Sequence, residues 1–352
     1  MKKVYMLRTH YPHWGAHTAF NALGRYVDRE RFHLKTRAVP MGDDLFKVPL
    51  VRNKCRNIIK AQGASAYQLN DLGAELSAFF YVLFHGVDII HLLDAEHSLL
   101  FLPRWFKKWR LLKSWPRIIA MFHQPPSVLE TLVNMDVMKQ VDCVLAVSPV
   151  QADYLAGFIP AERIKTILLG VDTDHFKPDH APKEGGKFKC LAGGVWLRDY
   201  ESLIDTARLL QDHKEIEFHV VAPRLDIPAD LDNIVLHRNI PDAALYRLYR
   251  TSHILFMPLK DATANTFLME GAACGLPVLS TDLESIRVYF PGDEAILIRD
   301  NAPQDFAEAL IGLSENCRQL GEMAESARRR MVELSWDKIS KEYESLYEGG
   351  DA

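Results

Sequence analysis

The sequence predicts an α/β protein built from two doubly wound domains, and three observations support this prediction. Short apolar segments alternate with amphipathic helical segments along most of the chain. A polar segment rich in Asp, Pro, Lys and Gly interrupts the alternation at 172–186. The length of 352 residues suits two domains, since domains usually hold about 100–200 residues. Strands that alternate with helices form parallel sheets covered on both faces.

The first series of elements begins with an apolar strand at 3–8, followed by a turn that contains Gly15 and by a helix at 17–29. Further strands are expected at 87–92, 117–122 and 143–147. We therefore place the first domain at 1–172.

The second series follows the polar segment, which places the second domain at 173–335. Its expected strands are 188–193, 216–221, 254–257 and 277–280, and its expected helices are 201–210, 242–249, 265–274 and 303–314. Ligands of doubly wound sheets bind beyond the carboxyl ends of the strands, so these ends are where we look for a site.

The composition fits a globular, cytoplasmic protein. Hydrophobic residues make up 48% and charged residues 25%. We find no apolar run of about 18 residues, and the first segment turns polar too soon for a signal peptide. The five cysteines are far apart and form no CxxC pair, which is typical of reduced thiols.

The net charge of −4 is unevenly distributed. Residues 1–178 carry a net charge of +7, and the remainder carries −11. This contrast suggests that the two domains have different partners. Neither half is basic enough to make nucleic acid the expected ligand.

Segment 258–280 is the most informative about chemistry. A strand ends in a polar loop, and a helix begins near Asn265 and ends at Gly275. The free amides of Asn265 and Thr266, together with the helix dipole, can bind an anion. Glu270, one turn further on, can accept hydrogen bonds from sugar hydroxyls. The alternative is an ordinary strand–helix–strand unit with Glu270 on its solvated face.

The run Glu-Gly-Ala-Ala-Cys-Gly-Leu-Pro-Val at 270–278 resembles the donor-site signature of the family 4 retaining glycosyltransferases of GT-B architecture. Upstream, Val147-Ser148, 164–167, Gly170-Val171-Asp172 and Phe176-Lys177-Pro178 are similar to that family's interdomain passage. The final helix, expected at 336–348, resembles the one that crosses back onto the first domain of these enzymes.

The resemblance implies two Rossmann-like domains that face a central cleft. It also implies transfer of a sugar, with retention, from a nucleotide diphosphate donor to an acceptor hydroxyl. The nucleotide sugar would be a substrate, and neither cofactor nor metal is expected. A hexosyltransferase of bacterial cell-envelope polysaccharide, lipid-linked saccharide or glycoconjugate synthesis is the expected type.

The resemblance also assigns donor-binding residues, with departures from the family pattern. The first donor-site Glu of the family falls on Ala262, so Asp261 substitutes for it or the loop shifts. Arg198 takes the position of a Lys that clamps the diphosphate, whereas the family's Arg is replaced by Gly193 or Gly194. Arg224 either compensates for that missing Arg or is a solvated loop residue.

In the first domain, Gly15 and Ala16 lie where the family brings its backbone close to the diphosphate or acceptor. His123 matches a His that many members place beside the transferred sugar, the alternative being a structural His. His91 stays open between structure and site. Asp94 and Glu96 follow it and are expected to face the acceptor. The catalytic set that we predict is His123, Arg198, Asp261 and Glu270.

Residues 97–129 contain no Asp or Glu, and the part at 101–117 combines Trp105 and Trp109 with several Lys and Arg. A helical wheel puts the aromatic residues of 101–112 on one face and Lys107 and Lys108 on the other. This pattern fits adsorption to the inner face of an anionic membrane, or else a solvated helix on the first sheet. A second acid-free basic stretch at 47–60 favours adsorption.

Other functions stay open at this point. A nucleotide-sugar epimerase or a phosphorylase of the same architecture would share these motifs, and so would a non-catalytic sugar-nucleotide-binding protein. Asp172-Thr173-Asp174 has the form of a metal-binding motif, but in the interdomain passage we interpret it as structural. No His/Cys cluster has zinc spacing.

Overall fold

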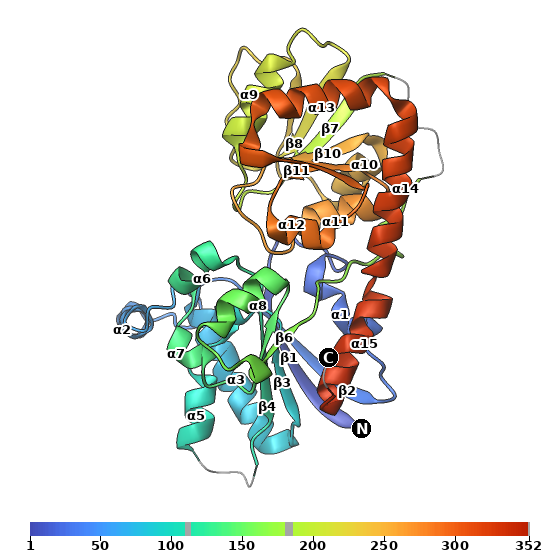
Figure 1. Cartoon of the computed structure of the whole chain (residues 1–352). Coiled ribbons are helices and arrows are strands. Elements are labelled where there is room, and N and C mark those ends of the chain that lie inside the picture. Colours follow the sequence, from blue (N-terminus) through green and yellow to red (C-terminus); the bar gives the residue numbers. More distant parts are fainter. Residues whose placement is uncertain (110–113, 180–185, 351–352) are drawn as a thin grey trace. The chain divides into compact units, whose positions relative to one another are not determined.

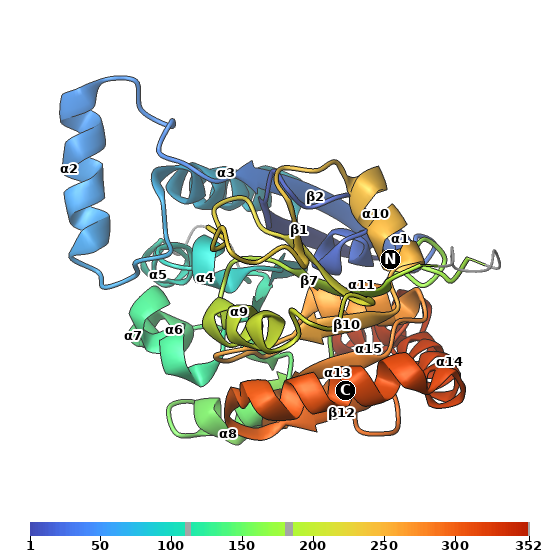
Figure 2. The same cartoon turned by 90° about the horizontal axis from the view of Figure 1, so that it is seen from above.

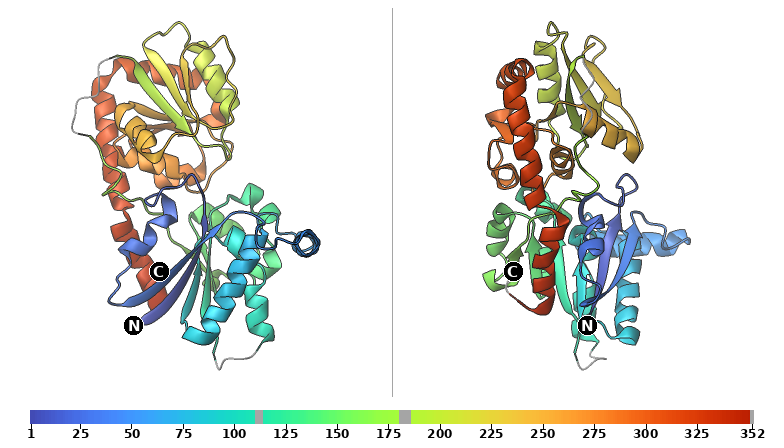
Figure 3. Two further views of the ribbon diagram at one scale, coloured as in Figure 1. Left: turned by 180° about the vertical axis from the view of Figure 1, so that it is seen from behind. Right: turned by 90° about the vertical axis from the view of Figure 1, so that its right-hand side faces the viewer.

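The computed structural model describes residues 1–109, 114–179 and 186–350, which fold into two compact units. Unit 1 consists of 1–16, 20–169 and 337–352, and unit 2 consists of 17–19 and 170–336. Within the described ranges each unit contains one six-stranded, fully parallel sheet with helices on both faces (Figures 1 and 3). The architecture is α/β with two doubly wound units, as the sequence predicted.

The sheet of unit 1 has the strand order β2-β1-β3-β4-β5-β6. Its strands are β1 (Lys2–His10), β2 (Phe32–Pro40), β3 (Ile89–Leu92), β4 (Arg117–Phe122), β5 (Cys143–Ala146) and β6 (Ile164–Thr166). The central strands β3 and β5 are buried at every position, because helices cover both of their faces. This burial explains why they read as continuous apolar runs.

Most helices of unit 1 are short, and the longer ones are α2, α3 and α15. The helices are η1 (Ala19–Asn21), α1 (Leu23–Tyr26), α2 (Pro49–Lys60), α3 (Leu69–His85), α4 (Ala95–Ser98), α5 (Leu102–Lys108), α6 (Pro126–Leu132), α7 (Met135–Met138), α8 (Pro149–Ala156), η2 (Ala161–Arg163) and α15 (Trp336–Glu348). α3, α5 and α8 pack with one face of the sheet in a single apolar core. α2 extends away from the rest of the unit (Figure 2).

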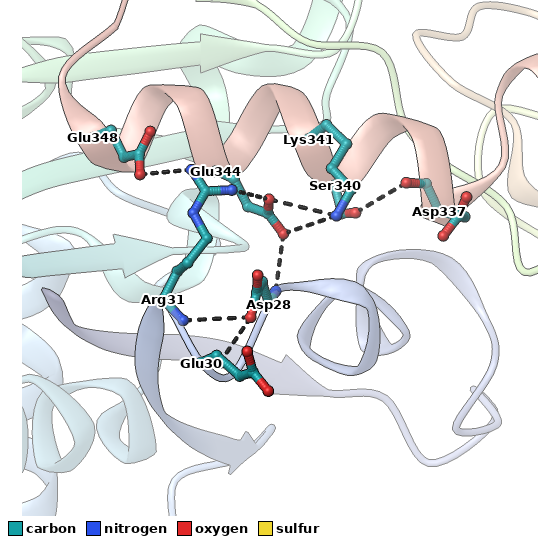
Figure 4. A network of polar contacts seen from close by, with 8 residues as sticks. All are labelled: Asp28, Glu30, Arg31, Asp337, Ser340, Lys341, Glu344 and Glu348. Atoms are coloured by element: carbon teal, nitrogen blue, oxygen red, sulfur yellow. Dashed lines mark hydrogen bonds and ion pairs between the residues drawn. The ribbon is translucent and has the colours of Figure 1, made fainter. Parts of the chain in front are cut away.

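The last helix, α15, packs on the opposite face of the same sheet. The Tyr343 hydroxyl contacts Met121 of β4, and the buried Glu344 carboxylate accepts hydrogen bonds from Arg31 (3.0 Å) and from the Asp28 amide (2.9 Å) (Figure 4). Arg31 also pairs with Glu348 at 2.6 Å. Unit 1 is therefore completed by a segment more than 300 positions after its first strand.

Unit 2 repeats the plan with the strand order β12-β11-β10-β7-β8-β9. Its strands are β7 (Phe188–Gly193), β8 (Ile216–Val221), β9 (Ile234–His237), β10 (Ile254–Met257), β11 (Val278–Thr281) and β12 (Ala295–Ile298). Its helices are α9 (Tyr200–Leu209), α10 (Asp242–Thr251), α11 (Thr266–Ala273), α12 (Glu284–Tyr289), η3 (Arg299–Asn301), α13 (Pro303–Glu315) and α14 (Cys317–Glu333). α9, α13 and part of α14 share the apolar core on one face of this sheet.

Two expectations about helices are wrong. The helix expected at 17–29 is only η1 followed by α1, because Ala19 adopts a positive φ of 48° that a continuous helix does not allow. The basic and aromatic helix expected through Leu112 ends at Lys108, and residues 110–113 lie outside the described ranges. Of its aromatic residues, Trp109 is exposed, whereas two others are packed inside the unit. Phe106 is buried, and Trp105 packs edge-on against Phe79 of α3.

Candidate functional site

The amino end of α11 lies at the carboxyl edge of the sheet of unit 2, directly after β10. Asn265 caps this helix, since its side-chain oxygen accepts a hydrogen bond from the Leu268 amide at 3.3 Å. The Asn265 residue is buried, and Thr266 is half-buried. The Nδ2 atom of Asn265 has no hydrogen-bond partner in the described part of the chain. An unpaired buried donor at a helix amino end is suited to an anionic or hydroxyl-bearing ligand.

Arg198 lies beside that helix end, in the loop that follows β7. Its guanidinium donates to the carbonyl oxygens of Gly193 (2.9 Å) and Trp196 (3.0 Å) and approaches Asn265 Oδ1 at 3.5 Å. Gly194 and Leu197 both have positive φ, so the loop is tightly curled around the side chain. Burial lowers the pKa of Arg198, although the group stays charged at neutral pH. The loop thus holds a fixed positive charge next to the α11 amides.

Glu270, on the next turn of α11, is buried with 5% of its surface exposed. The Tyr249 hydroxyl of α10 donates to Glu270 Oε2 at 3.2 Å, and the Thr18 side chain also contacts the carboxyl, although Oε1 makes no hydrogen bond of normal geometry among the described residues. Burial raises the pKa of the Glu270 carboxyl to about 8. The solvated location that the sequence left open is excluded. A buried carboxyl with one unpaired oxygen is poised to accept hydrogen bonds from a ligand's hydroxyl groups.

Tyr249 is the neighbour of this site that sequence reasoning missed. It is fully buried, and its ring packs against Phe267 of α11 at 5.1 Å between centroids. Nothing in the sequence linked a Tyr near the end of α10 to a Glu that lies 21 positions later. Only the packing of α10 on α11 shows that this hydroxyl orients the Glu270 carboxyl.

The other predicted donor-side residues lie in loops of the same unit. Asp261 is half-buried and its carboxylate accepts from the Ala262 amide at 2.7 Å, in the loop between β10 and α11. Ala262 itself is buried. Arg224 is exposed in the loop after β8. The structure therefore keeps Asp261 near α11, and the roles of Asp261 and Arg224 in donor binding stay predictions.

His123 and Glu96 meet at the carboxyl edge of the sheet of unit 1. The Glu96 carboxylate accepts hydrogen bonds from the amides of His123 (2.5 Å) and Gln124 (2.8 Å), and its Oε2 has no partner within the described residues. His123 Nε2 lies 2.7 Å from the Leu93 carbonyl oxygen. Burial lowers the pKa of His123 and raises that of Glu96 to about 8. Both groups are thus held towards their neutral forms.

Asp94 and Tyr11 lie in the same region. The Tyr11 hydroxyl donates to Asp94 Oδ2 at 2.7 Å, and burial together with this carboxylate raises the pKa of Tyr11. Asp94 is almost fully buried. The structure therefore brings His123, Asp94 and Glu96 together, whereas their expected contact with an acceptor stays a prediction.

His91, which the sequence left open between a structural role and the acceptor site, has a structural contact. The ring is completely buried on the other face of the sheet, where Nδ1 lies 2.7 Å from the Tyr347 hydroxyl of α15. Burial lowers the pKa of His91 to about 3, so the ring is neutral. Its role in the fold is to pack the last helix.

The turn after β1 contains the remaining predicted residues, Gly15 and Ala16. The Gly15 carbonyl accepts a hydrogen bond from Asn21 Nδ2 at 3.0 Å, and Ala16 is exposed. Asp172, from the motif interpreted as structural, is buried and accepts from the His175 amide at 3.1 Å. No group of three or more His, Cys, Asp or Glu side chains within 1–109, 114–179 and 186–350 could hold a metal ion.

Comparison with known proteins finds a family similarity in the α11 region. Residues 191–316 match the family model described as "Glycosyl transferases group 1". The matched segment lies in unit 2 and includes Arg198, Asn265 and Glu270, so the cluster built above falls within the part of the chain that is similar to this family.

The similarity extends to curated enzymes and to solved structures. The D-inositol 3-phosphate glycosyltransferase of Gordonia bronchialis is 30% identical over 242 residues, which is 59% of this chain and 52% of that protein. The chain spans about half the length of the curated relatives it matches.

Sucrose-phosphate synthase of Thermosynechococcus elongatus superposes with a TM-score of 0.72 at 14% identity, covering 99% of both chains. A structure of Anabaena HepE in complex with UDP-glucose gives 0.72 at 12% identity, covering 99% of this chain and all of that one. At these identities the likeness concerns the fold. Among the described residues, no helix is both long and apolar enough to cross a membrane.

Proposed function

We propose that this protein is a retaining glycosyltransferase that moves a sugar from a nucleotide diphosphate donor to an acceptor hydroxyl without a metal ion. The observation that carries the proposal is the α11 site, where two buried polar atoms lack partners among the described residues beside a fixed positive charge. These atoms are Asn265 Nδ2 and Glu270 Oε1, and the charge is that of Arg198. The similarity of the segment that contains the site to the group 1 glycosyltransferases supports it.

Each part of the site has a task in this reaction. The α11 amides and Arg198 bind the diphosphate and stabilise the negative charge that grows on it as the sugar leaves. Glu270, oriented by Tyr249, accepts hydrogen bonds from donor hydroxyl groups. The acceptor proton passes to an oxygen of the departing diphosphate. No side chain needs to act as a nucleophile in this scheme.

In unit 1 we propose that His123 lies beside the transferred sugar and that Asp94 and Glu96 bind the acceptor. The acceptor is a saccharide or a lipid-linked saccharide of the cell envelope, and the enzyme works in the cytoplasm at the inner face of the membrane. HepE was solved with UDP-glucose, which makes UDP-glucose the first donor to test.

Nucleotide binding tests the donor site directly. Arg198→Ala should weaken binding of UDP or UDP-glucose by about 10–150-fold, since a hydrogen bond to a charged group contributes about 1.5–3 kcal/mol. Glu270→Ala should weaken it by about 2–10-fold, because the Glu270 carboxyl is mostly neutral at pH 7 and a hydrogen bond between neutral groups contributes about 0.5–1.5 kcal/mol. The matched controls are Arg318→Ala and Glu322→Ala, which alter an exposed ion pair on α14. Unchanged affinity in both site variants, with their fold intact, would remove the assignment.

Turnover separates an enzyme from a non-catalytic binding protein. The wild-type chain should release UDP slowly from UDP-glucose alone and faster once a suitable acceptor is added. The anomeric configuration of the product, measured by NMR, should match that of the donor. Tight donor binding without any release of UDP across an acceptor panel would favour a binding protein instead.

A further inference from the structure

Large apolar side chains gather on the outside of α2 and the segment that leads into it. Leu50 is 80% exposed and Ile58 49%, on a helix that extends away from the body of unit 1 (Figure 2). Their exposed neighbours are Met41, Leu45, Val48 and Val51. Single exposed apolar residues are normal on a protein surface, whereas a concentration of them within one segment marks a candidate interaction site.

The helix has one face that holds it to unit 1 and one that is left open. Ile59 is buried, Cys55 packs against the apolar core of the unit, and Arg56 pairs with Asp43. Leu50, Lys54 and Ile58 follow one another at a spacing of four residues and are all exposed. α2 thus presents exposed aliphatic side chains with a lysine between them.

The charged side chains of α2 itself are all basic, and the acidic residues Asp43 and Asp44 precede it. Residues 45–70 contain no Asp or Glu, whereas Lys47, Arg52, Lys54, Arg56 and Lys60 all lie within them. Lys47, Lys54 and Lys60 are exposed. Aliphatic side chains with lysines at their margin are typical of helices that lie in the interface of an anionic bilayer.

We propose that α2 binds the surface of an anionic lipid bilayer. Leu50, Val51 and Ile58 enter the boundary between headgroups and acyl chains, and Lys47 and Lys54 bind the headgroup phosphates. A helix of 12 residues is about 18 Å long and lies in the plane of the membrane. The inference rests on the proposed function in one respect, that the acceptor is presented at a membrane.

The surface differs from the one that the sequence suggested at 101–117. There Phe106 lies inside the unit and Trp105 packs on Phe79, so both are already occupied. Trp109 is 51% exposed, and Lys107 and Lys108 stay on the surface. The 101–117 segment can add positive charge, but α2 supplies the apolar residues.

Charge also decides between a bilayer and a second copy of the chain. A symmetric dimer through this face would bring the same basic residues together, since each subunit presents the same patch. Like charges at an interface oppose association, whereas anionic headgroups attract them.

Co-sedimentation of the full chain with vesicles tests the proposal, without nucleotide or acceptor present. The wild type should bind vesicles of phosphatidylglycerol and phosphatidylcholine, bind neutral phosphatidylcholine vesicles weakly, and leave the anionic ones in 1 M NaCl. Lys47→Glu/Lys54→Glu should weaken binding at least about 25-fold, because each basic side chain near an anionic surface strengthens binding about fivefold. Lys107→Glu/Lys108→Glu makes the same change in charge and should have a smaller effect.

Apolar insertion is tested separately. Leu50→Ser/Ile58→Ser should weaken vesicle binding about tenfold or more, because both side chains would otherwise leave water. The matched control, Leu209→Ser/Val332→Ser, changes exposed apolar residues of unit 2 and should bind as the wild type does. Tryptic cleavage patterns equal to those of the wild type would show that the variants are folded.

Three results would overturn the proposal. They are equal binding of anionic and neutral vesicles, unchanged binding of both α2 variants, and a lipid-free dimer that Leu50→Ser/Ile58→Ser dissociates. Nucleotide affinity, measured on the same variants, keeps the two proposals apart. An α2 variant that no longer binds vesicles but binds UDP normally has lost only the membrane contact. A wild-type protein that binds vesicles but not UDP would contradict the proposed function and leave the membrane proposal standing.

Discussion

Replacing Glu270 by Gln tests whether burial of the Glu270 carboxylate destabilises the protein when no ligand is bound. The carboxyl is 5% exposed, and burial raises its pKa to about 8 from an ordinary 4.5. A carboxyl whose pKa is higher in the folded than in the unfolded chain takes up a proton on folding. The protein therefore loses stability as the pH rises from about 4.5 towards 8.

The size of the effect follows from the two pKa values. One proton gives a slope of at most about 1.4 kcal/mol per pH unit, so Glu270 lowers the free energy of unfolding by about 3–4 kcal/mol between pH 5 and pH 8. The amide of Gln carries no charge and still accepts from the Tyr249 hydroxyl. Glu270→Gln should thus be more stable than the wild type, increasingly so towards pH 8.

Scanning calorimetry at pH 5, 6, 7 and 8 measures this difference. For a unit of this size, about 1 kcal/mol shifts Tm by about 2–4 °C, so the gain in Tm should grow by about 6–16 °C over this range. Glu322→Gln, on the exposed side of α14, should show no such trend. A constant difference across this pH range, or a Glu270→Gln protein less stable than the wild type at pH 8, would refute the reasoning.

Three further perturbations test other parts of the molecule. Gly193→Ala should destabilise by about 1–3 kcal/mol in urea unfolding, because its new Cβ would lie 2.2 Å from the Phe267 ring. Gly312→Ala, with open space around the added Cβ, should instead stabilise by about 0.5–1 kcal/mol, and equal effects would contradict the packing argument. Glu344→Ala should cost about 1.5–3 kcal/mol and speed proteolysis of α15, since Arg31 loses its buried partner; unchanged proteolysis would speak against this anchor. Transferase activity should persist in EDTA, and its loss with recovery on adding Mg²⁺ or Mn²⁺ would reject the metal-free mechanism.

Strands inside the two sheets were the most predictable elements. Segments 117–122, 188–193, 216–221 and 254–257 have the bounds that their apolar runs predicted. The sequence analysis missed the strands at the sheet edges, β2 and β6 in unit 1 and β9 and β12 in unit 2, which are only partly buried. An edge strand can be stable with apolar side chains on only one of its faces, so its apolar pattern in the sequence is too weak to recognise.

The site was predictable where one helix carries it and unpredictable where distant segments meet. Asn265 and Glu270 belong to α11, and a cap followed by a buried face is visible in the local sequence. The role of His91 stayed open because its partner, Tyr347, lies 256 positions away. Whether Trp105 packs on the first sheet or faces a membrane also stayed open, because a helical wheel contains no information about Phe79.

The return of α15 to unit 1 affects how the chain folds during its synthesis. The ribosome releases β1 to β6 first, yet the helix that covers His91 and Met121 emerges about 170 residues after β6. At a synthesis rate of about 5–20 residues per second, that face of the nascent sheet stays uncovered for roughly 10–35 s before α15 is made. During this interval an apolar face is open to chaperones or to wrong pairing, while unit 2 can already complete its own sheet. The domain whose strands are made first is thus the last to be finished.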